Sequence, residues 1–294
     1  MDAVLVTGPN GFVGTHLREE LGEVFVPTDV DVLDHEAATE AVRAARPRAV
    51  VHLAAHSSVA SSWATTAEAW SVNVVGTVNV LDAVRTEAPD ARILFPSTGQ
   101  VYGRAARVPT TEDEPVAPIS PYAASKAAAE IACEQARRAC GLDVVVARAF
   151  NHEGPGRDER FAVGSWTQQI ARLELEGGGV LRVGDVAPER DITDVRDVCH
   201  AYALLLDPSV PAGTYNVASG RAVSMRRVVE MLTSLAEAPI EVETDPERFR
   251  PADLAVVCGD PSRLRAATGW QPEIPLEQTL EDALAAARRA MVAT

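Results

Sequence analysis

A glycine-rich turn after the first apolar run constrains the fold of this chain more than any other feature. The run Val4-Leu5-Val6 leads directly into a turn with the spacing G-x-x-G-x-x-G, and a helical pattern follows it to Leu21. Glycines placed between a strand and a helix let backbone N–H groups approach a pyrophosphate at the positive end of the helix. An ordinary glycine turn remains the alternative, but the position after the first strand favours a nucleotide site. The candidate binding residues of this turn are Gly8, Asn10, Gly11, Phe12, Val13 and Gly14.

Apolar β-branched runs alternate with helical patterns through the first half of the chain. The expected strands are Val4–Val6, Val24–Val26, Ala49–Leu53, Ile93–Phe95 and Val144–Ala147. The expected helices are Gly11–Leu21, His35–Ala45, Ala69–Arg85 and Tyr122–Cys140. Near-continuous apolar strands suit a parallel sheet covered on both faces. The pattern therefore predicts the α/β class, with a Rossmann-like doubly wound parallel sheet.

An acidic residue follows the second predicted strand. Asp29 lies about 20 residues after the first glycine, where a carboxylate accepts hydrogen bonds from the adenosine ribose. This position favours NAD over NADP, because a 2′-phosphate would meet a like charge. Asp31 and Asp34 crowd the same turn, and the acid at 34 also fits as the cap of the helix that begins at His35. Ribose recognition by Asp29 therefore competes with a capping role for this turn.

The regular alternation loosens near residue 151. We expect residues 1–151 to form an NAD(P)-binding Rossmann domain and residues 152–294 to form mainly a smaller α/β lobe for the substrate. Helical patterns at Phe161–Glu176 and from Ser224 to Glu237 belong to this second part. Segments near 190–217 are expected to rejoin the first domain.

Composition restricts the partners of the chain. Its 294 residues carry a formal net charge of −15, so the general basic surface that nucleic acid or an anionic membrane requires is missing. Any phosphate must be bound by a local cluster. Four cysteines without a C-x-x-C pair, and an N-terminus without a signal-peptide pattern, indicate a cytoplasmic protein. The longest uncharged stretch, 49–67, is too polar to span a membrane, so no membrane segment is expected.

Two further motifs point to chemistry. Tyr122 and Lys126 are four residues apart, which places a phenol and an ammonium on one helix face. A cation about 4 Å from a phenol lowers its pKa from near 10 towards neutrality, in the range for acid–base work. The Y-x-x-x-K spacing also occurs in ordinary exposed helices. Ser97-Thr98 leaves the fourth strand, where hydroxyls either hold a substrate carbonyl or satisfy a polar turn.

These motifs together resemble the extended short-chain dehydrogenase/reductases that act on nucleotide sugars. Besides the glycine turn, the resemblance rests on His52-Leu53-Ala54-Ala55, Asn73 in Ser71–Thr77, Ser97-Thr98 before Val101-Tyr102-Gly103, and Ser120-Pro121-Tyr122 with Lys126. It covers nearly the whole chain. The segments Arg148–Gly156 and Arg190–Asp197 look most like those of enzymes that convert GDP-mannose.

The resemblance implies roles for individual residues. Thr98, Tyr122 and Lys126 would form the catalytic group, in which Tyr122 donates a proton to a keto oxygen, Thr98 hydrogen-bonds that oxygen, and Lys126 binds the nicotinamide ribose and lowers the tyrosine pKa. The implied cofactor contacts beyond the turn are Asp29, Asp31, Val32, Leu53, Ala54, Ala55, Asn73 and His152. Asn151, Arg190 and Arg250 would contact the nucleotide diphosphate, although Arg250 also fits a surface ion pair.

One departure separates the activities within the family. Its 4,6-dehydratases carry a glutamate two residues after the catalytic threonine, whereas this chain has Gly99 and Gln100. An amide cannot remove a proton as that base does. The resemblance therefore implies a homodimeric NAD(P)H-dependent reductase of a nucleotide-linked 4-keto-6-deoxyhexose, with GDP-4-keto-6-deoxymannose the expected substrate. A nucleotide-sugar 4-epimerase, or a nucleotide-sensing protein without turnover, remains the alternative.

A metal site is not expected. His52 and His56 are spaced i, i+4, but the first follows an apolar strand and the sequence offers no evident third ligand.

Overall fold

The computed structural model describes residues 3–249 and 254–292. Five strands of the first half and one strand of the second half form a six-stranded parallel sheet in the order β2-β1-β3-β4-β5-β9. The strands are β1 (Val4–Thr7), β2 (Phe25–Thr28), β3 (Ala49–His52), β4 (Arg92–Thr98), β5 (Val144–Ala149) and β9 (Thr214–Val217). The prediction of a doubly wound parallel sheet is confirmed.

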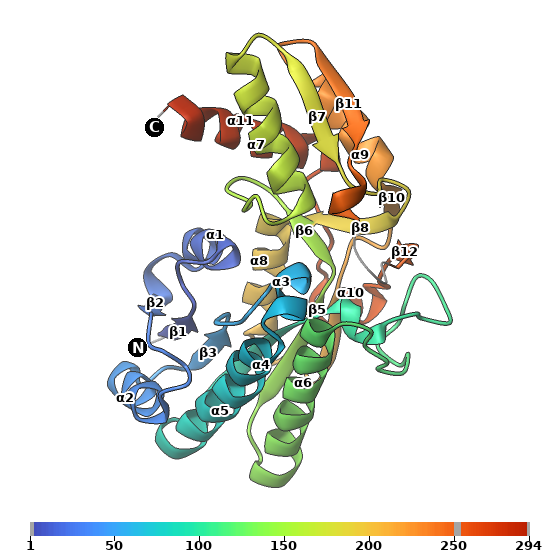
Figure 1. Cartoon of the computed structure of the whole chain (residues 1–294). Helices are drawn as coiled ribbons and strands as arrows, with labels where there is room; N and C mark the ends of the chain where they lie inside the picture. Colours follow the sequence, from blue (N-terminus) through green and yellow to red (C-terminus); the bar gives the residue numbers. More distant parts are fainter. Residues whose placement is uncertain (1–2, 250–253, 293–294) are drawn as a thin grey trace.

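Helices cover both faces of this sheet (Figure 1). They are α1 (Phe12–Leu21), α2 (His35–Ala45), α3 (Val59–Ala64), α4 (Thr66–Trp70), α5 (Gly76–Glu87), α6 (Pro121–Cys140), α8 (Val195–Leu205) and α10 (Ser262–Thr268). Alternation along β5 shows why two layers form. Val145 and Ala147 pack in the core beneath α1 and α8, whereas Val144 and Val146 pack in the core beneath α2, α5 and α6. Each face of the sheet thus buries its own set of apolar side chains.

The second half of the chain builds a smaller group of sheets at the carboxyl ends of the large sheet, at the top of Figure 1. In it β6 (Asn151–Glu153) and β12 (Val256–Val257) pair parallel with β8 (Glu189–Asp194), and β10 (Ala222–Ser224) pairs antiparallel with β8. A separate pair joins β7 (Gly179–Val183) to β11 (Ile240–Thr244). The helices α7 (Ala162–Leu175), α9 (Met225–Ser234) and α11 (Leu276–Val292) share the apolar core of this part.

The segments near 190–217 divide between the two parts. β9 is an edge strand of the large sheet and α8 packs on α1, whereas β8 belongs to the smaller sheet. In the described residues no helix is long and apolar enough to cross a membrane.

One predicted helix differs in the structure. The helical pattern at 69–85 is interrupted, because Ser71–Val75 forms a π-helical turn between α4 and α5. The turn presents Asn73 inwards at 1% exposure, and it brings Gly76 so close to Val32 that an added Cβ would lie 2.6 Å from a methyl group. Such turns within helices are often found at functional sites.

Candidate active site

The glycine-rich turn forms a backbone cradle at the start of α1. Gly8 has a φ of 64°, and a Cβ added to it would lie 2.7 Å from the backbone nitrogen of Ala54. At Gly14 a Cβ would lie 2.6 Å from the carbonyl oxygen of Pro9. Gly11 precedes the first helical residue, Phe12, and no side chain of the described residues caps the helix there. The first N–H groups of α1 are therefore placed to bind an anion.

The acidic residues in the turn after β2 have different roles. Asp34 caps α2 by accepting a hydrogen bond from the Ala37 amide at 3.0 Å. Asp29 is exposed and accepts a hydrogen bond from the Asn10 side chain at 3.1 Å, so it lies against the glycine turn. Asp31 is exposed beside it, and Val32 is buried. Asp34 therefore caps α2, and Asp29 is not needed for that role and is available for a ribose.

The segment after β3 is fixed by Thr7. The Thr7 hydroxyl accepts a hydrogen bond from the Ala54 amide at 3.1 Å and bonds the His52 ring at 2.8 Å. The other ring nitrogen of His52 lies 3.2 Å from the Thr77 hydroxyl. Burial, with the charge of Lys126 nearby, lowers the pKa of His52 to about 3. His52 is therefore a neutral packing residue that holds Leu53, Ala54 and Ala55 against the glycine turn.

Asn73 connects this segment to α6. Its carboxamide oxygen accepts from the His56 amide at 2.8 Å, and its nitrogen donates to the His56 carbonyl at 3.1 Å and to Ser125 Oγ at 2.9 Å. Ser125 in turn donates to the Tyr122 carbonyl at 2.8 Å. Asn73 thus links the segment after β3 to α6 through hydrogen bonds. Direct contact between Asn73 and a cofactor stays a prediction.

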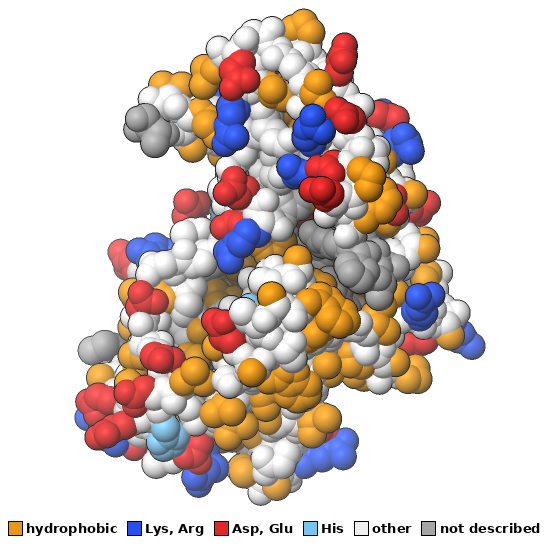
Figure 2. Space-filling view, viewed as in Figure 1, with side chains coloured by type: hydrophobic (Ala, Val, Ile, Leu, Met, Phe, Trp, Pro, Cys, Tyr) orange, Lys and Arg blue, Asp and Glu red, His pale blue; other side chains and the backbone are white. Residues whose placement is uncertain are grey.

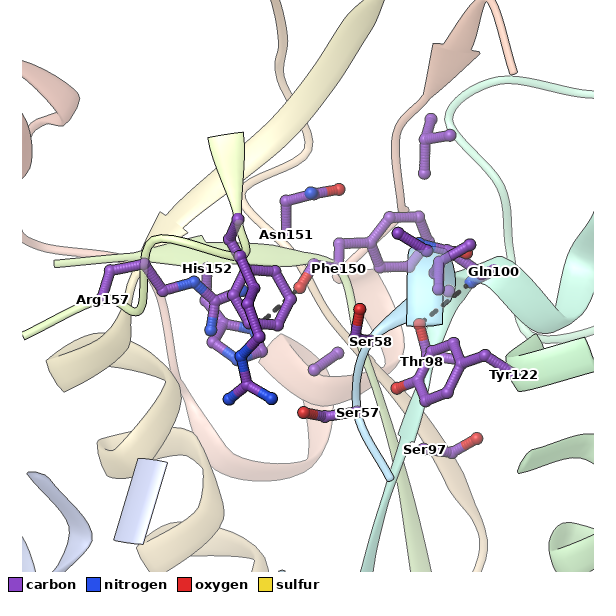
Figure 3. Close-up of a pocket in the computed structure, with 17 residues that line it drawn as sticks. Ser57, Ser58, Ser97, Thr98, Gln100, Tyr122, Phe150, Asn151, His152 and Arg157 are labelled. Atoms are coloured by element: carbon purple, nitrogen blue, oxygen red, sulfur yellow. Dashed lines mark hydrogen bonds between the residues drawn. The ribbon is translucent and has the colours of Figure 1, made fainter. Parts of the chain in front are cut away.

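Thr98 and Tyr122 line one cavity between the two parts of the chain (Figure 3). Thr98 ends β4, and Tyr122 is the second residue of α6, which Ser120 caps through the Ala123 amide at 3.2 Å. Pro121 begins the helix, where a proline costs no hydrogen bond. Asn151 and His152 of β6 also line this cavity (Figure 3). The other lining residues include Ser57, Ser58, Ser97, Gln100, Phe150, Arg157 and Phe161.

Burial dominates the ionisation of the catalytic candidates. It raises the pKa of Tyr122 to about 12, against a smaller lowering by Thr98 and by the charge of Arg157. The expectation that Lys126 brings this pKa towards neutrality is wrong for the structure, because loss of hydration outweighs the favourable contacts. The phenol is therefore protonated near neutral pH, which suits a proton donor. Burial also lowers the pKa of Lys126 to about 8, which the charge of Glu130 opposes.

Arg157 is a site residue that the sequence reasoning missed. Its guanidinium lies 4.6 Å from the ring centre of Phe12 and 3.7 Å from that of Phe161, and it borders both the cavity and the groove beside the glycine turn. Phe12 also stacks on His152, with 6.1 Å between ring centres. His152 donates from Nδ1 to the Phe150 carbonyl at 3.0 Å, and burial lowers its pKa to about 4. This neutral histidine and this cation flank the phosphate-binding end of α1.

A second cavity adjoins the first and extends into the smaller part of the chain. Asn151 lines both cavities, and Arg190 lines the second together with Trp63, Trp166, Arg248 and Phe249. Arg190 also donates to the carbonyls of Glu189 and Leu254, each at 2.8 Å. Arg250, the remaining predicted diphosphate contact, lies outside the described residues.

The acidic side chains of the segment Arg190–Asp197 form hydrogen bonds within the protein. Asp191 is fully buried and accepts from the amides of Ser219 and Gly220, at 2.8 and 3.0 Å. Asp194 caps α8 through the Arg196 amide at 2.8 Å. These acids therefore anchor the backbone that follows Arg190.

Comparisons with known proteins agree with this arrangement. A family model described as GDP-mannose 4,6 dehydratase matches residues 20–283. The chain is 37% identical over 288 residues to the GDP-6-deoxy-D-mannose reductase of Pseudomonas aeruginosa, covering 94% of each chain. The structure of RMD from that organism complexed with NADPH has a TM-score of 0.91 at 35% identity, over 99% of this chain and 100% of that one. The UDP-glucose 4-epimerase of Thermus thermophilus in complex with NAD has a TM-score of 0.87 at 30% identity, over 98% and 99% of the chains.

Proposed function

The chain belongs to the extended short-chain dehydrogenase/reductases that act on nucleotide sugars, within the GDP-mannose 4,6 dehydratase family, and from this premise we propose that it is an NAD(P)H-dependent reductase of GDP-4-keto-6-deoxymannose. The observation that carries the proposal is the pairing of a protonated Tyr122 with Thr98 in one cavity, with Gln100 where a dehydratase has a base. The relative named as GDP-6-deoxy-D-mannose reductase supports the substrate.

The cofactor fits the cradle beside the glycine turn. A Cβ at Gly8 would collide with the backbone of Ala54, and one at Gly14 with the carbonyl oxygens of Pro9 and Gly8, so only glycine permits the tight turn that presents the N–H groups of α1 to a pyrophosphate. Arg157 lines the groove at the same place and offers its guanidinium to the pyrophosphate, although Glu153 at 3.3 Å offsets part of its charge. A bound reduced nicotinamide supplies the hydride that reduces C4.

The chain's own residues then complete the reduction. Thr98 and Tyr122 hold the C4 keto oxygen by hydrogen bonds, and Tyr122 gives its proton to that oxygen as the carbonyl becomes an alcohol. The ammonium of Lys126, four residues further on α6, binds the nicotinamide ribose. Asn151 and Arg190 bind the diphosphate end of the substrate in the second cavity. The proposal keeps the division into residues 1–151 mainly for the cofactor, with segments near 190–217 rejoining them, and residues 152–294 mainly for the substrate.

Consumption of the cofactor tests this function. Purified protein with GDP-4-keto-6-deoxymannose is expected to oxidise NADH or NADPH in an amount equal to the sugar reduced, seen as a loss of absorbance at the reduced-nicotinamide band. Interconversion of 4-hydroxy sugars without net loss of reduced cofactor would instead show an epimerase.

A homodimer is part of the proposal. Hydrophobic side chains gather over α4, α5 and α6 in Figure 2, and Trp70, Val78 and Ile131 of these helices are 40%, 45% and 72% exposed. Exposed apolar side chains of this size on packed helices favour association with a second copy. Sedimentation velocity should give twice the chain mass, and Ile131→Glu should shift the protein towards the monomer.

The free cysteines further support a reducing, cytoplasmic setting.

A further inference from the structure

We propose that Glu130 is a positioning residue for the reduction, because one buried carboxylate connects α6, which carries Tyr122, to β4, which carries Thr98, and to the neighbouring strand β5. The inference rests on the proposed function for its kinetic readouts. Its structural readout is independent of any substrate.

The contacts of Glu130 are short and come from two neighbouring strands. Glu130 lies on α6, one helical turn beyond Lys126 and two beyond Tyr122, and is 9% exposed. Its Oε1 accepts a hydrogen bond from the hydroxyl of Ser97 on β4, the residue before Thr98. Arg148 on β5 donates to Oε1 at 3.0 Å and to Oε2 at 2.6 Å. The carboxylate therefore fixes the register of α6 against the ends of both strands.

The connection continues on the far side of Arg148. Its guanidinium lies 4.7 Å from the ring centre of Tyr102, whose hydroxyl donates to Asn216 Oδ1 at 2.7 Å. The backbone N–H of Asn216 donates to Glu112 Oε1 at 2.8 Å. A buried network whose members are bonded to one another resists displacement of any one of them. Helix α6 is thus tied to β4, to β5 and, through Asn216, to β9.

The charge of Glu130 also acts on Lys126. The groups that face this ammonium are Glu130 and Cys133 from α6 and His52 from β3, and of these His52 is neutral near pH 7. The negative charge one turn away favours the charged form of the lysine, against burial. If Glu130 and Arg148 served only the structure, neutral side chains of similar volume could replace them without changing the ionisation of Lys126.

A charge-free double variant separates positioning from folding. Glu130→Gln with Arg148→Met removes both buried charges together, and the methionine keeps a contact with the Tyr102 ring. Ser97→Ala removes only the hydroxyl that joins β4 to the carboxylate. The control is Arg92→Met with Asp143→Asn, which removes a pair at 2.7 Å between the buried Arg92, at the other end of β4, and the partly exposed Asp143. For each protein, kcat, KM, the pH profile and the melting temperature are measured.

We expect the double variant to lose about a hundredfold in kcat with less than a threefold change in KM, on the scale of a misplaced catalytic group. The decline of its activity at alkaline pH should begin at a lower pH than in the wild type. Ser97→Ala should lose kcat in the same direction, whereas the control should lose melting temperature and keep kcat. Wild-type kcat and pH profile in the double variant would overturn the inference. If that variant did not fold, wild-type kcat in Ser97→Ala would overturn it.

The wild type is assayed alongside, so failure of the proposed function is seen separately as absence of reduction by the unaltered protein. In that case crystal structures decide the inference. The separation of the Thr98 and Tyr122 hydroxyls should increase in Ser97→Ala relative to the wild type, and an unchanged separation would overturn the inference.

Discussion

The ammonium of Lys126 lies 4.1 Å from the ring centre of Phe95, and the lysine is 3% exposed. Water is therefore largely excluded from this charge, which packs on an aromatic face and is favoured by the negative charge of Glu130 one turn away. A lysine held in this way loses its proton more easily than one in water, because burial penalises the charged form. Its pKa of about 8 falls within the range of an ordinary activity assay.

The first prediction concerns pH. Because Lys126 is charged below its pKa and neutral above it, kcat should be constant near neutrality and fall as the pH rises through about 8. Tyr122, with a pKa of about 12, cannot produce a decline at that pH. Lys126→Arg provides the control, since a guanidinium stays charged and its residual activity should not decline there. A kcat independent of pH up to 10 in the wild type would contradict the assignment.

The second prediction concerns the proton donor. Tyr122→Phe removes the phenolic hydroxyl and leaves the ring, so reduced cofactor should still bind while kcat falls by about a hundredfold or more. Fluorescence titration with NADH and steady-state kinetics measure the two quantities. Wild-type turnover in the folded variant would remove Tyr122 from the mechanism.

The third prediction concerns the choice between NADH and NADPH. Asp29 is exposed against the glycine turn, where its carboxylate would face the 2′-phosphate of NADPH. The kcat/KM for NADH should therefore equal or exceed that for NADPH. Asp29→Asn keeps the shape of the side chain and removes its charge. It should therefore raise kcat/KM for NADPH by about tenfold, which corresponds to the free energy of a shift of one pKa unit. Asp31→Asn serves as the matched control and should change the preference less. A clear wild-type preference for NADPH would show that Asp29 does not face the ribose.

The fourth prediction follows from Gln100. The family model is described as GDP-mannose 4,6 dehydratase, yet an amide at position 100 cannot remove a proton from the sugar. At Gly99 an added Cβ would lie 2.7 Å from the Phe150 ring, so that position has no room for an acid either. Incubation with GDP-mannose and NAD or NADP should therefore yield no 4-keto-6-deoxy sugar by mass spectrometry. Formation of that product at rates comparable to ketone reduction would show that another base serves.

Local sequence patterns predicted the parts of the site that lie within single elements. The glycine turn, the acid after β2 and the Tyr122–Lys126 spacing each depend on a few adjacent residues. In the structure Tyr122 lines the cavity, the glycine turn lines the adjoining groove, and Asp29 is hydrogen-bonded to Asn10 of that turn. Five strands of the large sheet follow from the same local patterns, because each apolar run is long enough to form one buried strand. The sixth strand, β9, is expected only as a segment that rejoins the first domain.

Contacts between distant elements could not be predicted in this way. Arg157 is part of the site because Phe12 of α1 and Phe161 before α7 enclose it, and no spacing in the sequence joins these residues. The π-helical turn at Asn73 depends on the close packing of Gly76 against Val32. The raised pKa of Tyr122 likewise depends on burial by several elements, whereas the sequence argument considered one neighbouring charge.

Transfer of an isotopic label tests the central claim most directly. NADH carrying deuterium at C4 of the nicotinamide, on the face that the enzyme uses, is incubated with GDP-4-keto-6-deoxymannose, and the product is analysed by mass spectrometry and NMR. Both stereoisomers of the labelled cofactor are tested. A reductase with Tyr122 as proton donor predicts one deuterium at C4 of the sugar for each cofactor oxidised, from one of the two stereoisomers. A 4-hydroxy product without deuterium, formed while reduced cofactor stays constant, would contradict the account.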